Sequence, residues 1–125
     1  MAESHWETLL RALAVPGCVV PAQVLTELQL VTSKRGPQVI AAANALVARL
    51  IKTGAEIAPF THRHAEITNT ARERYGKGNG TGGLLNFGDL MVYAVAKDRN
   101  EPLLFTGRDF ASTDLQLHPA SRLEP

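Results

Sequence analysis

The sequence contains one cysteine, Cys18, so the chain cannot form an intramolecular disulfide. Cys18 lies in an apolar run, which predicts a buried structural thiol of the kind found in a reducing cytosol. No stretch approaches the roughly 18 apolar residues that span a bilayer. No basic segment precedes an apolar one at the N-terminus. We therefore expect a cytoplasmic protein with neither a membrane span nor a secretory signal.

Several common kinds of site are also missing. There is no cluster of cysteine and histidine at zinc spacing, and His62 and His64, two positions apart, are expected to be solvated rather than ligands. No Ser-His-Asp or Cys-His arrangement stands out. The glycine-rich segment 76–83 is not followed by Gly-Lys-Ser/Thr, which leaves a nucleotide-binding domain with little support. The net charge of +1 neither demands nor excludes a polyanionic partner.

The 125 residues, 45% of them hydrophobic, are enough for one domain, expected over residues 1–125. Short strands that alternate with helices predict an α/β fold with a parallel sheet. A parallel sheet is normally covered by helices on both faces, and only a few short strands are expected beside five helices. The predicted sheet is therefore incomplete. Helices are expected over 1–15, 22–33, 37–52, 62–75 and 87–98, and strands over 18–20, 55–60, 102–106 and 115–117. In the helix over 37–52, the expected buried residues are Ile40, Val47, Leu50 and Ile51.

Two acids lie on predicted helices. Glu27 flanks an apolar helix face between Val24 and Val31, where a carboxylate needs a cation, hydrogen-bond donors or a metal as its partner. From spacing alone, a salt bridge to an Arg or Lys at the rim of the core is the favoured interpretation of Glu27. Asp89 occupies the third position of a helix that is apolar from residue 90 to 96 and capped by Asn86. An acid in the first turn also favours the helix dipole, so both interpretations stay open.

Two further acids, Asp109 and Asp114, follow the strand expected over 102–106. Loops past the carboxyl ends of parallel strands are common ligand sites, although turns also favour Asp. If acids from separate elements converge, a hard divalent cation such as Mg²⁺ or Mn²⁺ must neutralise them. Such sites carry phosphoryl chemistry.

Basic residues gather between residues 62 and 77, next to the glycine-rich segment. Together with Tyr75 they could contact a phosphate backbone, or they could form a solvated helix face. The basic residues are Arg63, Arg72, Arg74 and Lys77, and they are interspersed with Glu66 and Glu73.

Four short runs, in this order and spacing, resemble the C-terminal half of VapC-type PIN domains. The segment 21–33 is similar to the helix that supplies the family's glutamate, here Glu27. The four runs are Tyr75-Gly76-Lys77-Gly78, Leu85-Asn86-Phe87-Gly88-Asp89, Glu101-Pro102-Leu103-Leu104-Phe105 and Thr106-Gly107-Arg108-Asp109-Phe110-Ala111-Ser112-Thr113-Asp114.

The resemblance implies a three-layer PIN-like fold in which helices flank a short parallel sheet. It implies that Glu27, Asp89 and Asp109 hold Mg²⁺ or Mn²⁺ and that Asp114 is a further catalytic acid. Asn86 would cap the helix and could contact the site. The implied function is a metal-dependent endoribonuclease, the toxin of a VapBC-type pair that hydrolyses RNA phosphodiester bonds. The implied partners are RNA, a VapB-like antitoxin and a second copy of the chain in a homodimer.

The sequence departs from the family at its start. Family members begin with a central strand that carries an aspartate, whereas this chain starts at a segment similar to the following helix and has no Asp before Asp89. We therefore expect a PIN-like sheet without its N-terminal strand, with lower stability and a tendency to self-associate, because neighbouring backbone groups lose their partners. The alternative function is an inactive, truncated PIN module that binds an antitoxin or a PIN partner.

Overall fold

The structure is a computed structural model that describes residues 2–80, 82–104, 109–119 and 121. It has five α-helices and a short parallel sheet, which confirms the α/β prediction. The chain divides into two compact units, Met1–Pro59 and Phe60–Pro125. The expectation of one domain over residues 1–125 stays a prediction.

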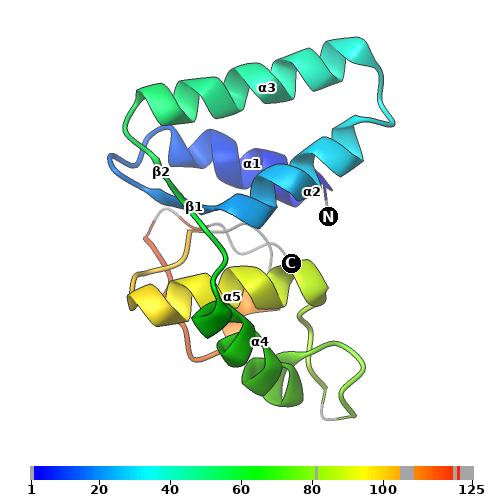
Figure 1. The fold of residues 1–125 in the computed structure, drawn as a ribbon, viewed down its shortest axis with the longest axis vertical. Helices are drawn as coiled ribbons and strands as arrows, with labels where there is room; N and C mark the ends of the chain where they lie inside the picture. The colour runs from blue at the N-terminus through cyan, green and yellow to red at the C-terminus, as the bar shows by residue number, and fades with distance from the viewer. Residues whose placement is uncertain (1, 81, 105–108, 120, 122–125) are drawn as a thin grey trace. The chain divides into compact units, whose positions relative to one another are not determined.

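The first unit packs three helices together with two paired strands (Figure 1). The strands β1 and β2 run parallel, with Val20 opposite Ile57. Each strand follows a helix that ends in a glycine-containing turn, at Gly17 and at Gly54. The elements are α1 (Ala2–Ala12), β1 (Val19–Pro21), α2 (Ala22–Thr32), α3 (Pro37–Lys52) and β2 (Glu56–Ala58). The buried apolar residues include Leu9, Val20, Val24, Leu28, Leu46 and Leu50.

The bounds of α3 match the prediction because Pro37 occupies its first turn, where the missing N–H costs no hydrogen bond. Its buried face differs from the predicted one. Leu50 is buried as expected, but Ile51 is 53% exposed, and the other buried positions are Ala43 and Leu46. A helix turns by about 100° per residue, so Leu50 and Ile51 cannot both lie at the centre of one apolar stripe.

The second unit is built on two helices that pack side by side, α4 (His62–Tyr75) and α5 (Phe87–Arg99) (Figure 1). Both begin at the residue expected from the sequence, because Thr61 and Asn86 accept hydrogen bonds from their first turns. The helix α5 forms the core of this unit. Its buried residues are Asp89, Leu90, Val92, Tyr93, Ala94 and Val95.

The strands expected over 102–106 and 115–117 are reduced, in the part that the structure describes, to one parallel bridge between Leu103 and Leu117. The Leu103 N–H donates to the Gln116 carbonyl at 2.9 Å, and the His118 N–H donates to the Leu103 carbonyl at 2.9 Å. Residues 105 and 106 lie outside the described residues. Across the described helices, none combines the length and the apolar character needed to cross a membrane.

Candidate functional site

Asp89 is a buried acid at the third position of α5, with 8% of its surface exposed. Its backbone N–H donates to Asn86 Oδ1 at 2.8 Å, and the Asn86 backbone N–H donates to Asp89 Oδ2 at 3.3 Å. This reciprocal pair fixes the carboxylate relative to the helix start. A carboxylate can accept about four hydrogen bonds or metal contacts, so the capping role and ligation of a cation are compatible.

Asp114 is held against the helix that carries Asp89. The Tyr93 hydroxyl donates to Asp114 Oδ1 at 2.6 Å, and Lys97 Nζ donates to Asp114 Oδ2 at 2.7 Å. Residues 89, 93 and 97 are spaced by four, so they share one face of α5. Asp114 therefore ties its own segment of chain to the face of α5 that carries Asp89, about one to two turns further along the helix.

The same contacts set the ionisation of this pair. Burial alone would raise the pKa of Asp114, but the hydrogen bonds from Lys97 and Tyr93 outweigh it, and the pKa of Asp114 lies below its usual range. Burial, and then the Asp114 carboxylate, raises the pKa of the Tyr93 hydroxyl well above its usual range. Tyr93 therefore stays a proton donor and Asp114 stays an anion at neutral pH.

Asp109 begins the short 3-10 helix η1 (Asp109–Ser112), directly after residues that lie outside the described part of the chain. Its side chain is exposed, whereas the next residue, Phe110, is buried with 8% exposure. The buried Phe110 ring anchors the turn, and the Asp109 carboxylate faces solvent within the second unit. An exposed carboxylate in an anchored turn is accessible to a cation and to a substrate.

Glu27 lies on α2 in the first unit, next to Val24 and Leu28, which are both buried. Glu27 itself is half-buried, and its Oε1 atom is shielded from solvent. The helical wheel predicted this position beside the apolar face. A shielded carboxylate oxygen is costly unless a donor or a cation approaches it.

The donor chemistry of these acids fits a hard divalent cation, since carboxylate oxygens are the ligands that Mg²⁺ and Mn²⁺ prefer. Asp89 and Asp109 share the second unit, whereas Glu27 belongs to the first. Within either unit, no group of three or more His, Cys, Asp or Glu side chains among the described residues is arranged to hold a metal ion. Two of the three expected ligands thus occur in one unit, and the set of three stays a prediction.

The end of α4 and the start of the glycine-rich segment, residues 72–79, border a hollow of about 310 Å³ in the second unit. Arg72 and Lys77 are exposed on its rim, and Glu73 brings one negative charge to it. The remaining lining residues are Gly78 and Asn79.

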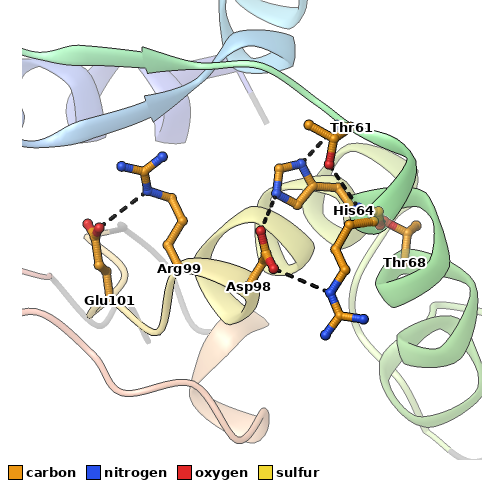
Figure 2. A network of polar contacts seen from close by, with 7 residues as sticks. Thr61, His64, Thr68, Asp98, Arg99 and Glu101 are labelled. Atoms are coloured by element: carbon orange, nitrogen blue, oxygen red, sulfur yellow. Dashed lines mark hydrogen bonds and ion pairs between the residues drawn. The ribbon is translucent and has the colours of Figure 1, made fainter.

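The expectation that His64 is solvated was wrong. His64 is 5% exposed, and it joins α4 to α5 through Asp98, as Figure 2 shows. The Thr61 N–H donates to His64 Nδ1 at 2.9 Å, which places the ring proton on Nε2, and Nε2 lies 3.0 Å from Asp98 Oδ2. Arg63 reaches the other oxygen of Asp98, with its Nε atom at 3.5 Å. The local signal was the position of His64 three residues after the cap Thr61.

His62 is solvated as expected, with 91% of its side chain exposed. Cys18 is half-buried rather than buried. Burial still raises the pKa of its thiol, and a backbone hydrogen bond opposes that shift.

Comparison with known proteins places these features in a family context. The sequence pattern described as "PIN domain" matches residues 2–115. Over 100 residues the chain is 40% identical to "Ribonuclease VapC36" of Mycobacterium tuberculosis, an alignment that covers 78% of this chain and 68% of that protein. Over 60 residues it is 45% identical to "Ribonuclease VapC28" of the same organism, covering 48% of this chain and 45% of the relative. The chain therefore spans less than half of the length of that second relative.

Proposed function

Because this chain belongs to the PIN-domain family, we propose that it is a metal-dependent endoribonuclease that hydrolyses RNA phosphodiester bonds. Its relatives in Mycobacterium tuberculosis are named as VapC ribonucleases. The observation that carries the proposal is Asp89: a buried carboxylate, fixed by Asn86, at the start of the most buried helix of the second unit. A structural cap alone would not require a carboxylate there, since an amide side chain such as Gln at the same position also accepts the hydrogen bond from the cap residue's N–H.

In this proposal Asp89 and Asp109 hold Mg²⁺ or Mn²⁺ together with Glu27. When bound, the cation would supply the Lewis acidity that lowers the pKa of water and steadies charge on a phosphate. Asn86 and Asp114 position these ligands or the segments that carry them. Asn86 sets the orientation of Asp89. Asp114 holds the segment that follows Asp109 on α5, through its hydrogen bonds with Tyr93 and Lys97. Asp114 could also assist as a further acid, as the family resemblance implies.

The proposal extends to partners. The similarity to VapC ribonucleases leads us to propose a toxin of a VapBC-type pair, with a VapB-like antitoxin as its inhibitor. We further propose that the chain acts on cytoplasmic RNA and forms a homodimer. Co-purification with an antitoxin encoded beside it, and light scattering on the purified chain, test these two partners separately.

The direct test of the activity is RNA cleavage by the purified full chain with Mg²⁺ or Mn²⁺, compared with chelator. The informative variant is Asp89→Asn combined with Asp109→Asn. The matched control is Asp98→Asn, which makes the same substitution at the other end of α5 in the network around His64. Circular dichroism melts show whether each variant is folded at the assay temperature.

We expect cleavage that needs the metal, survives in Asp98→Asn and falls at least about 100-fold in the double variant, the order of loss seen when key electrostatic groups are removed from an active site. A folded chain that cuts none of a broad set of RNAs would instead favour the alternative, a PIN module that binds an antitoxin without cutting. Cleavage that persists in chelator would contradict the metal-dependent proposal.

A further inference from the structure

An aromatic ring lies exposed at the start of the helix that carries Asp89. Phe87, the first residue of α5, is 75% exposed, and Leu84 in the preceding segment is 46% exposed. Single exposed apolar residues are ordinary, but a Phe ring this exposed is unusual among large hydrophobic side chains. Phe87 and Asp89 both lie in the first turn of α5, about 3 Å apart along the helix axis, and their side chains leave the helix on different sides.

Positive charge lies at the other end of the glycine-rich segment, where α4 ends. Arg72 and Lys77 are exposed on the rim of the hollow of about 310 Å³. Among the residues that the structure describes, no acidic side chain forms an ion pair with either of them. Arg72 in the last turn of α4 also favours the helix dipole, but Lys77 lies beyond the helix end, where that explanation is weaker.

Backbone contacts bring these two features together. The Lys77 N–H donates to the Leu85 carbonyl at 2.7 Å, and the Leu85 N–H donates to the Tyr75 carbonyl at 2.9 Å. Phe87 follows Leu85 by two residues. Because an extended residue spans at most about 3.6 Å, the Cα atoms of Lys77 and Phe87 lie within roughly 12 Å of each other.

The loop between them is pinned at a third point. The Asn79 side chain donates to the Glu73 carbonyl at 3.1 Å and accepts from the Gly83 N–H at 3.2 Å. One side chain therefore links the end of α4 to the segment that leads into α5. This link connects the cationic rim to the segment that leads to Phe87.

We propose that Arg72, Lys77 and Phe87 form a contact surface for single-stranded RNA, here called the loop surface. Arg72 and Lys77 bind successive phosphates, and one base stacks on the Phe87 ring. The combination of cations with an exposed aromatic ring is what unpaired nucleic acid recognises, since the backbone supplies charge and every base supplies a stacking face. This inference rests on the proposed function and adds to it the residues that guide the strand toward Asp89.

Charge complementarity favours RNA over a second copy of the chain as the occupant. Arg72 and Lys77 line the hollow beside one acid, Glu73, and neither forms an ion pair within the described part of the chain. A purely apolar interface would desolvate these two cations without supplying partners for them. The Glu73 carboxylate repels phosphate. Replacing Glu73 with a neutral residue should therefore strengthen RNA binding, whereas replacing Arg72 or Lys77 should weaken it.

The test is fluorescence anisotropy of a labelled, unstructured oligouridylate with the full chain in chelator, where cleavage does not interfere. We expect Phe87→Ala to weaken binding about 5-fold or more, and Phe87→Trp to retain it, because stacking on an aromatic ring contributes about 1–3 kcal/mol per base. Lys77→Gln and Arg72→Gln should each lower the slope of log affinity against log salt by about 0.7. Glu73→Gln should tighten binding.

The matched controls lie in the first unit. Leu30→Ala removes a side chain of similar exposure, 63%, and Lys52→Gln removes an exposed cation at a helix end. Both should leave affinity and salt slope unchanged. Light scattering on Phe87→Ala tests whether a second copy of the chain covers Phe87 instead. If Phe87 served dimer formation, the variant would have a different particle mass but the same affinity for RNA.

The outcomes separate this inference from the proposed function. A chain that cuts RNA, but whose Phe87→Ala and Leu30→Ala variants bind oligouridylate equally, overturns the loop surface and keeps the nuclease. A chain that cuts nothing, but loses RNA binding in Phe87→Ala, keeps the loop surface and overturns the nuclease. Absence of any RNA binding, or a change of oligomeric state as the only effect of Phe87→Ala, overturns the inference.

Discussion

At the scale of single residues, Asp114 shows how one carboxylate can hold its own segment of chain on a helix. Both of its oxygens accept hydrogen bonds from side chains of α5, one from Tyr93 and one from Lys97. These contacts fix the segment that follows Asp109. The structure thus supports a positioning role for Asp114, which family resemblance alone describes only as a further acid near the site.

The first prediction concerns this contact. Asp114→Asn keeps an acceptor for Tyr93 but loses the charge that pairs with Lys97, so we expect a loss of about 1 kcal/mol in the free energy of unfolding at pH 7. Because the folded-state pKa of Asp114 is lowered, its stabilising effect is complete above the usual aspartate pKa of about 3.9 and disappears as the pH falls through the lower folded value.

Urea denaturation of Asp114→Asn and of the unmodified chain, at several pH values from 7 downward, checks this. The difference in stability should be constant between pH 7 and about 5 and should shrink below about pH 4. A difference that grows on acidification would contradict the assignment. Asp109→Asn in metal-free buffer is the control, and we expect it to change stability by less than about 0.5 kcal/mol because this side chain is exposed.

A second prediction at this scale concerns His64. His64→Ala removes a buried ring, leaves the Thr61 N–H without its acceptor and removes one of the two partners of Asp98. We expect a loss of roughly 2–3 kcal/mol in the free energy of unfolding. His62→Ala, two positions earlier and 91% exposed at its side chain, should cost less than about 0.5 kcal/mol. Equal thermal shifts for the two variants would show that the network in Figure 2 contributes nothing.

At the scale of elements, the helices could be predicted closely because their ends are encoded locally. Thr61 and Asn86 cap α4 and α5 with their own side chains, and Pro37 is pre-set for the first turn of α3. The short strands were less predictable. A strand exists only where a partner pairs with it, so the stretch around Leu103 forms a single bridge among the described residues despite its apolar composition.

The glycine-rich segment carries a prediction of its own, since a side chain at Gly83 would overlap the backbone of Gly76 and Tyr75. A Cβ atom there would lie 2.6 Å from the Tyr75 carbonyl carbon, and neither backbone segment can rotate away. We expect Gly83→Ala to cost at least about 2 kcal/mol and to weaken RNA binding at the loop surface.

Gly78→Ala is the comparison. Gly78 has a positive φ of 83° but open space around its missing side chain, so alanine there should cost only about 1 kcal/mol. Denaturant midpoints for the two variants measure the difference. If Gly78→Ala proved the more damaging change, the close backbone approach at Gly83 would not be what shapes this loop.

At the scale of the whole molecule, the sequence predicts where the candidate acids lie along the chain but not whether they assemble into one site. Helical spacing predicted the buried flank of Glu27 and the capped position of Asp89, because both depend on contacts within a few residues. Convergence of the three acids depends on packing between elements far apart in the chain, which periodicity does not encode. Burial of His64 escaped prediction for the same reason, since its partner Asp98 lies 34 residues away.

The proposed function depends most on one hypothesis, that Asp89, Asp109 and Glu27 together hold a Mg²⁺ or Mn²⁺ ion. The most direct measurement is the binding of Mn²⁺ to the purified full chain, followed by electron paramagnetic resonance. We predict that Asp89→Asn, Asp109→Asn and Glu27→Gln each weaken binding about 10-fold or more, whereas Asp98→Asn leaves it unchanged. Binding that is absent from the folded chain, or equally strong in Asp89→Asn and Asp98→Asn, would contradict the claim.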